Sequence, residues 1–179
     1  RILQSGPVPA TVLRAAMILG SGSASFEMMR YLAERLPIMI TPKWVGMPTQ
    51  PIAISDVLYY LKGCMEHPET RGRTFDIGGP DIVAYRDLFK IFTREAGLPS
   101  PVLIPVPVLT PKLSALWIHL VTPVPGAIAQ PLTEGLSLPT TCTENSITKI
   151  IPQPLISCST AIRRALDRVN QEQVDTCWA

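Results

Sequence analysis

The sequence has few residues suited to binding a metal or forming disulfides. Its two histidines, His67 and His119, stand alone. Its four cysteines lie far apart, with no C-x-x-C motif: Cys64, Cys142, Cys158 and Cys177. Zinc sites and disulfide frameworks need such residues at close, regular spacing. We therefore expect neither in this chain, and we expect a cytoplasmic protein because free cysteines are typical of a reducing compartment.

The chain also lacks a strong charge of either sign. Lysine and arginine number 16 and aspartate and glutamate 14, which gives a net charge of +2. No run of basic residues occurs, and no stripe of basic residues alternates with aromatic ones. Binding to nucleic acid normally needs a concentrated basic patch, so we expect no nucleic-acid partner.

No apolar run is long enough to cross a membrane. The strongest candidate is a helix between Pro111 and Pro123, with Leu113, Leu116, Trp117 and Leu120 on one face. At 1.5 Å per residue such a helix cannot span a hydrocarbon core of about 30 Å. Three roles stay open for residues 106–125: packing on the protein itself, contact with a protein partner, and peripheral contact with a membrane surface.

What the sequence does contain is an alternation of strand and helix patterns. The expected strands are Thr11–Leu19, buried on both faces, and the shorter 38–40, 52–54 and 74–77. The expected helices run from a cap at Ser23 or Ser25 to Pro37, from a cap at Asp56 onward, from Tyr85 to Ala96 with Gly97 as its stop, and from about Ser159. A proline-rich stretch, 99–131, reads as an irregular apolar lobe. This order favours an α/β fold with a parallel sheet covered by helices.

The helices should bury one face each. The residues that fall on these faces are Phe26, Met29, Ala33 and Leu36; Val57, Tyr60, Leu61 and Cys64; Leu88, Phe89 and Phe92; and Ile162, Leu166 and Val169. Their spacing of three or four residues is typical of amphipathic helices that cover a core.

A glycine-rich loop follows the first expected strand and opens the first expected helix. Gly20, Gly22 and Ser25 give the pattern G-x-G-x-x-S. A dinucleotide-binding loop has glycine or alanine at the last position, and an acidic residue about 20 positions on that holds the ribose. This chain has "ITPKW" there instead. We therefore interpret the loop as a likeness of a pyrophosphate cradle and not as one.

Four stretches carry a resemblance to a known family: "TVLRAAMILG", "QPIAISDVLYYLKGCME", "TFDIGGPDIVAYRDLFKIF" and "SITKIIPQPLISCSTAIRRALDRV". In this order they resemble the C-terminal part of extended and atypical short-chain dehydrogenases, the NAD(P)-binding epimerase/dehydratase-like proteins. The branch most similar includes NmrA-type proteins and the accessory subunit of respiratory NADH dehydrogenase. The resemblance covers nearly the whole chain and depends on the order and spacing of the stretches.

This resemblance implies a division of the chain and a set of site residues. Residues 1–98 would form the C-terminal half of a Rossmann-like domain that binds NAD or NADP, and residues 99–179 a substrate-side lobe that ends in a helix. The residues that would line the nicotinamide are Ala15, Ala16 and Met17. Those that would line the substrate pocket are Gly20, Ser21, Ser23, Phe26, Trp44, Gln50 and Trp117. Asp56 would be structural, and Gly78 and Gly79 would permit a bend after a late strand.

The family's catalytic and phosphate-binding motifs have no counterpart here. No Tyr-x-x-x-Lys occurs, and the nearest arrangement, Tyr31 with Arg35, is interpreted as a surface pair. The chain begins with Arg1, and both ends look like cuts, so we expect a fragment that lacks the N-terminal half of its own domain. The expected function is the substrate-side half of an NAD(P)-dependent oxidoreductase or epimerase acting on a small molecule, inactive alone. The alternative is a non-catalytic NAD(P)-binding protein with a structural or regulatory role.

Overall fold

The structure is a computed structural model, and it describes residues 5–106 and 138–174. The strands are β1 (Val12–Ala15), β2 (Ile18–Leu19), β3 (Ile38–Pro42), β4 (Pro48–Thr49), β5 (Ile52–Ala53), β6 (Thr74–Ile77), β7 (Val83–Ala84) and β8 (Val102–Val106). The α-helices are α1 (Ala24–Arg35), α2 (Ile54–Glu66), α3 (Tyr85–Glu95), α6 (Ile147–Ile150) and α7 (Cys158–Asn170), with short 3-10 turns η1 (Lys43–Gly46) and η2 (Pro68–Thr70). None of the described helices is both long enough and apolar enough to cross a bilayer.

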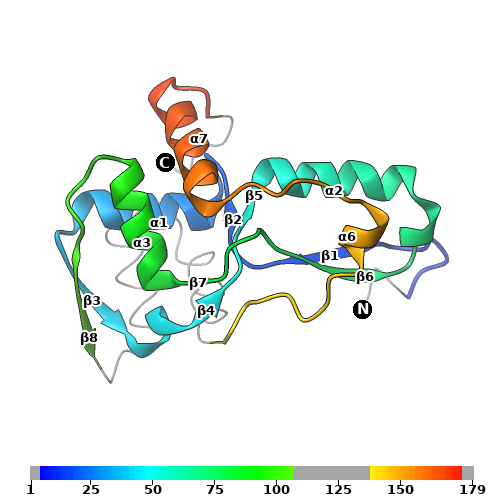
Figure 1. Ribbon diagram of the computed structural model, residues 1–179, viewed down its shortest axis with the longest axis horizontal. Helices are drawn as coiled ribbons and strands as arrows, with labels where there is room; N and C mark the ends of the chain where they lie inside the picture. The colour runs from blue at the N-terminus through cyan, green and yellow to red at the C-terminus, as the bar shows by residue number, and fades with distance from the viewer. Residues whose placement is uncertain (1–4, 107–137, 175–179) are drawn as a thin grey trace.

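The strands form four short pairs, three of them parallel. β1 pairs with β6 in the register Val12↔Thr74 to Ala15↔Ile77, β2 pairs with β5, and β3 with β8, while β4 and β7 are antiparallel. In Figure 1, α2 runs beside β1 and β6, and α1, α3 and α7 gather at the other end of the molecule. The expected α/β fold with parallel strands and covering helices is confirmed.

The core consists of two clusters of buried side chains. The larger joins α1, α3 and α7, and within it the rings of Phe26 and Phe92 meet edge to face with centroids 6.0 Å apart. The smaller joins α2, β6 and the segment around α6. Because β3 pairs with β8 and α3 packs on α7, contacts cross residue 98. The domain division at that residue stays a prediction.

Several predicted elements are confirmed. The helix expected over 85–96 is α3, followed by Gly97 with a φ of +66°, and the last helix begins one residue before Ser159. β6 has the expected bounds. Of the expected inward faces, only Leu61 is clearly wrong, since its side chain is exposed.

Two strand predictions were wrong. The expected strand over 11–19 is interrupted between Ala15 and Ile18, and Arg14 and Ala15 are exposed. The expected burial of both faces therefore fails at Arg14 and Ala15, and among the described residues β1 pairs only with β6. The second error concerns the beginning of the stretch 99–131, which was expected to be irregular. Its residues 102–106 form the strand β8.

Asp56 is structural, as expected, but it does not cap α2. The helix begins two residues earlier, and its N-cap residue, Ala53, makes no side-chain cap hydrogen bond. The buried Asp56 carboxylate instead accepts a hydrogen bond from the Ile156 amide at 2.9 Å. The Gln153 side chain donates to the Asp56 carbonyl at 3.2 Å. Asp56 thus fixes residues 153–156 against α2.

Gly78 and Gly79 are needed for close approach and not for a bend. Neither has a positive φ. A Cβ on Gly78 would lie 2.7 Å from the Gln50 side chain and 2.8 Å from the Cys142 sulfur, and one on Gly79 would overlap the Pro51 carbonyl oxygen. The missing side chains let the end of β6 lie directly against residues 50–51.

Candidate functional site

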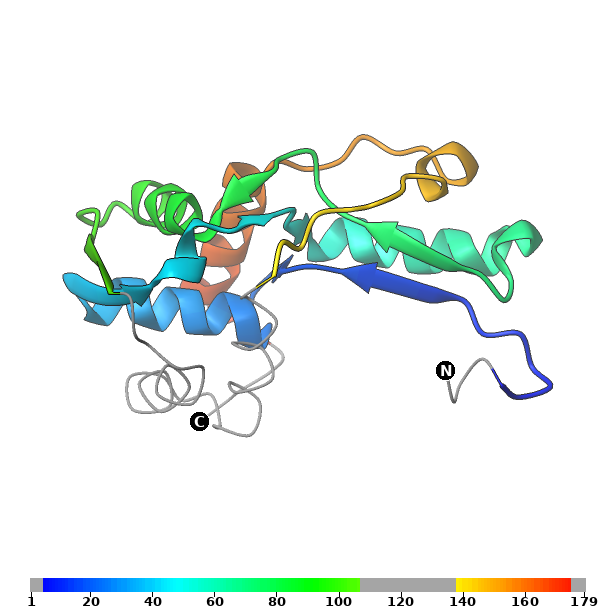
Figure 2. The same cartoon turned by 90° about the horizontal axis from the view of Figure 1, so that it is seen from below.

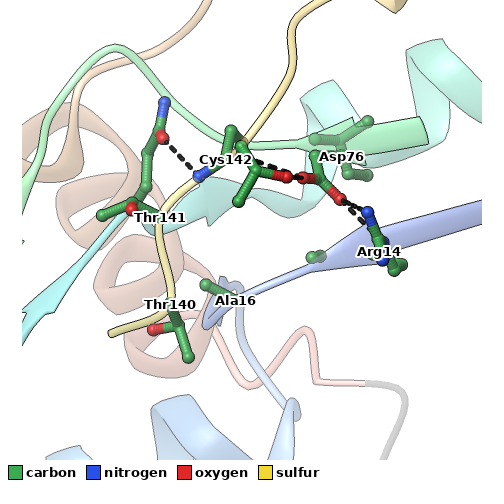
Figure 3. A pocket seen from close by; sticks show the side chains of 10 residues that line it. Arg14, Ala16, Asp76, Thr140, Thr141 and Cys142 are labelled. Carbon is green, nitrogen blue, oxygen red and sulfur yellow. Dashed lines mark hydrogen bonds and ion pairs between the residues drawn. The ribbon is translucent and has the colours of Figure 1, made fainter. Parts of the chain in front are cut away.

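A cavity of about 250 Å³ lies at the carboxyl ends of β1 and β6 (Figure 3). Ala15 and Ala16 contribute from the end of β1, Asp76 and Ile77 from β6, and Gln50 from the residues before β5. Residues 140–143, here called the strap, form the remaining wall. The carboxyl ends of parallel strands are where open α/β sheets bind ligands.

Gln50 fixes the strap to the end of β6. Its side-chain oxygen accepts a hydrogen bond from the Cys142 amide at 3.0 Å, and its side-chain nitrogen donates to the Gly79 carbonyl at 2.8 Å. The Gln50 amide also donates to the Thr140 carbonyl at 3.0 Å. All of these bonds are made by groups of one residue, so Gln50 sets the position of this wall.

Asp76 fixes the other end of the strap. One carboxylate oxygen accepts from Arg14 Nε and Nη2, both at 2.7 Å, and the other accepts from the Thr143 amide at 2.9 Å and hydroxyl at 2.6 Å. Burial acts to raise the pKa of Asp76, but the hydrogen bonds from Thr143 and the Arg14 charge outweigh it, and the pKa lies below its usual value. The Asp76 amide donates to Glu144 at 2.7 Å. Asp76 is therefore a charged anchor for residues 143–144.

The described lining of this cavity is suited to binding a ligand and not to acid–base catalysis. Its described lining contains no histidine, lysine or tyrosine that could move a proton near neutral pH. Burial, and then the negative charges of Asp76 and Glu144, raise the pKa of the Cys142 thiol, so this sulfur is not an activated nucleophile. Among residues 5–106 and 138–174, no group of three metal-ligating side chains occurs.

The structure brings together three of the predicted site residues and separates the others. Ala15, Ala16 and Gln50 line the cavity at β1 and β6. Gly20 and Ser21 line a second cavity, of about 690 Å³, between α2 and α7.

Of the other five predicted residues, three are described, and these three line neither cavity. Met17 and Phe26 are buried in the larger core cluster. Ser23 is the N-cap of α1. The Trp44 side chain and Trp117 lie outside the described residues, and all of these pocket roles stay predictions.

The glycine-rich loop binds a carboxylate of its own chain. Ser23 accepts a hydrogen bond from the Phe26 amide at 3.2 Å and so caps α1, as expected. The Gly22 amide donates to Glu27 at 3.1 Å, and Arg30 donates to the same buried carboxylate at 2.7 Å. The Glu27 carboxylate thus occupies the position at this helix N-terminus where an anion would bind. This agrees with the interpretation that the loop resembles a pyrophosphate cradle without being one.

The Tyr31 and Arg35 pair lies on α1 and does not line the cavity. The Arg35 guanidinium stacks on the Tyr31 ring at 4.7 Å, and Arg30 stacks on the same ring at 4.2 Å.

The sequence signals missed two residues that shape the site. Asp76 reads as one polar position within a strand, and Cys142 belongs to a stretch with no periodic pattern. Neither has a local signal, because their partners are distant in the sequence.

Comparison with solved structures identifies the fold. RMD from Pseudomonas aeruginosa, complexed with NADPH, aligns with a TM-score of 0.60 and 10% identity over 90% of this chain. UDP-glucuronic acid 4-epimerase from Bacillus cereus, in complex with NAD, gives 0.60 and 12% over 91%. UDP-glucose 4-epimerase from Thermotoga maritima, with UDP-glucose, gives 0.61 and 15% over 90%. The chain shares its fold with NAD(P)-binding epimerases.

The likeness extends to only part of each epimerase-type protein. This chain spans 48%, 45% and 46% of those three chains, so it corresponds to about half of their length. At such low identity the likeness shows the fold alone. No protein-family model and no curated protein matches the sequence.

Proposed function

We propose that this chain is the substrate-side half of an NAD(P)-dependent short-chain dehydrogenase-like oxidoreductase or epimerase that acts on a small molecule. The observation that carries the proposal is the cavity at the carboxyl ends of β1 and β6, with Ala15 and Ala16 in its wall. Support comes from two proteins of the same fold whose structures contain NADPH or NAD. A cytoplasmic location belongs to the same proposal.

The residues present fit one end of such a cofactor. Ala15 and Ala16 are small, so a planar ring could approach the strand end, and the strap held by Gln50 and Asp76 would exclude water from one side. When bound, the nicotinamide would supply hydride transfer. The described residues offer no pyrophosphate site at the loop before α1, because Glu27 already binds there. The phosphate groups would therefore depend on a further part of a longer protein.

A second function is favoured by the lining of the cavity. Because no described lining residue is an acid or base suited to neutral pH, a non-catalytic NAD(P)-binding protein with a structural or regulatory role is the alternative. The two differ in the chain that precedes residue 1. An enzyme needs Tyr-x-x-x-Lys there, whereas a binding protein needs only the glycine-rich loop.

Calorimetry with NADPH tests the proposal. We expect residues 1–179 alone to show no submillimolar affinity, and the full-length protein to bind. In the full-length protein, Ala16→Leu should weaken NADPH binding at least about tenfold, because the larger side chain would occupy space inside the cavity. Ala10→Leu is the matched control, since Ala10 is similarly half-buried but lines no described cavity.

Two results would contradict it. Submillimolar binding by residues 1–179 would show that the cofactor does not need a further half. Equal NADPH affinity of the Ala16→Leu and Ala10→Leu proteins would show that this cavity is not the nicotinamide site. Turnover of small carbonyl compounds by the full-length protein separates the enzyme from the non-catalytic alternative.

A further inference from the structure

The outer face of the β3 and β8 pair presents four apolar side chains to solvent. Ile38 and Ile40 of β3 are 57% and 58% exposed, and Val102 and Ile104 of β8 are 59% and 46% exposed. The register Ile38↔Val102 and Ile40↔Ile104 places these four beside one another on one side of the sheet, which we call the β3/β8 face. Single exposed apolar side chains are ordinary, but a contiguous group on a sheet indicates a contact surface.

The other face of the same pair is already packed. Met39 is buried, and Leu103 packs against the larger core cluster. Both strands are therefore apolar at successive positions, without the alternation of apolar and polar side chains that is typical of a half-solvated strand. Parallel strands are normally covered on both faces. The sequence of these two strands thus predicts a second layer over the β3/β8 face.

No described element supplies that layer. The helices α1, α3 and α7 join in the larger core cluster, and α2 and α6 contribute to the smaller one. Figures 1 and 2 show β3 and β8 at one end of the molecule, and β6 and α2 toward the other. A further strand that paired with β1 would therefore leave the β3/β8 face open.

The surroundings of the β3/β8 face carry little charge. Residues 36–42 and 98–106, which contain both strands and the approach to each, include no charged side chain. Arg35, the residue before the first of these ranges, stacks on the Tyr31 ring at 4.7 Å. Attachment to an anionic membrane uses clusters of basic residues, and a charged protein partner needs complementary charges around the contact. An uncharged face can instead meet an identical copy of itself without like-charge repulsion.

We propose that the β3/β8 face is the contact between two copies of this chain, packed face to face about a twofold axis. A twofold contact uses the same patch on both copies, and two layers of strands pack about 10 Å apart with their side chains interleaved. A stable interface takes about 20–30 residues a side, and this face is much smaller, so we expect a weak dimer with a Kd of about 10–100 µM.

This dimer is independent of the proposed cofactor binding. The cavity at β1 and β6 has no lining residue from β3 or β8. Each copy would therefore keep its cavity open, and NADPH should leave the association constant unchanged. Loss of NADPH binding in a protein that still dimerises through the β3/β8 face would refute the proposed function and support the dimer.

Sedimentation equilibrium of the full-length protein tests the contact. Ile40→Lys should weaken association at least about 100-fold, because a twofold contact places the unpaired charge in the apolar layer from both copies. Ile82→Lys is the matched control, since Ile82 is 60% exposed but belongs to neither strand. In dilute protein, both variants should change the unfolding equilibrium constant by less than about threefold, because exposed positions tolerate substitution.

Isoleucine methyl NMR of the unsubstituted protein provides a readout that needs no variant. The δ1 methyl signals of Ile38, Ile40 and Ile104 should shift as the protein concentration rises from about 5 to about 500 µM, which spans the expected Kd. The signals of Ile54 and Ile82, which are exposed elsewhere on the surface, should stay in place.

Three outcomes would overturn the dimer contact. The first is a protein that remains monomeric at about 500 µM, with no change in these methyl signals. The second is an association that Ile40→Lys and Ile82→Lys weaken equally, or that shifts the Ile54 signal and leaves those of the β3/β8 face in place. The third is a monomer in which Ile40→Lys raises the unfolding equilibrium constant more than about tenfold, which would show that another part of the same chain covers the face.

Discussion

The Asp76 carboxylate provides the sharpest test of how the strap is held. In Asp76→Asn, one carboxylate oxygen becomes an NH₂ group, which must then face a donor of either Arg14 or Thr143. Hydrogen bonds to a charged group contribute about 1.5–3 kcal/mol each. The Arg14 side chain is 60% exposed, so its ion pair should contribute at most about 1 kcal/mol. We expect Asp76→Asn to lower the free energy of unfolding by about 2–3 kcal/mol.

Arg14→Ala separates the two sources of stability. It removes the solvent-screened pair and leaves both Thr143 hydrogen bonds, so it should lower the free energy of unfolding by less than about 1 kcal/mol. Urea denaturation of the three proteins at pH 7 measures both effects. If Arg14→Ala destabilised the protein as much as Asp76→Asn, the ion pair and not the strap would be the main partner of Asp76, and the reasoning would be refuted.

The pH dependence gives an independent check with a defined sign. The pKa of Asp76 is lower in the folded protein, so its contribution to stability is present above the unfolded pKa of about 3.9 and is lost as the pH falls through the folded pKa. The difference between the unsubstituted protein and Asp76→Asn should therefore be constant near neutral pH and should shrink below about pH 4. A difference that persists unchanged at pH 3 would contradict this assignment.

Three further changes test the packing and the charges. Gly79→Ala should lower the free energy of unfolding by about 1–3 kcal/mol or more, because the new Cβ overlaps the Pro51 carbonyl, whereas Gly46→Ala, which meets nothing within 4 Å, should change it by less than about 0.5 kcal/mol in the same urea titration. Burial, and then the nearby Asp81 charge, raise the pKa of the Cys158 thiol to about 12, so DTNB at pH 8 should modify Cys158 only after unfolding; rapid labelling in the native protein would be inconsistent with this. Glu27→Ala should lower the free energy of unfolding by about 2–4 kcal/mol, and sulfate should restore part of the loss by binding at the vacated loop. Glu34→Ala, which also removes an Arg30 partner, should show no such sulfate effect.

The elements that the sequence predicts well are those with complete local signals. α3 has an apolar face and a glycine stop, so its bounds follow from the pattern alone. β8 was missed because a proline, here Pro105, is unusual within a strand, yet β8 pairs with β3 along the full length of both. Asp56 was misassigned because aspartate before a helix usually caps it, whereas here its partner, Ile156, lies 100 residues away.

The candidate site was only partly predictable for the same reason. Ala15 and Ala16 end an apolar strand, which is a local signal, and the cavity forms there. The strap is held by contacts between residues 67 and 92 positions apart, from Asp76 to Thr143 and from Gln50 to Cys142. No window of the sequence contains both members of either pair. Such walls follow from the tertiary structure and not from a motif.

The glycine-rich loop shows how a motif can be correct in form and different in chemistry. Gly22 has a φ of +77°, as a tight turn into a helix requires, and the helix N-terminus behind it favours an anion. The anion is supplied by Glu27, one turn along the same helix, and Arg30 neutralises it. A cofactor phosphate at this loop would have to displace a buried, ion-paired carboxylate. Since the cavity at β1 and β6 lacks an acid or base in its described lining, both the phosphate site and the proton transfer of the proposed reaction require groups beyond those described in this chain.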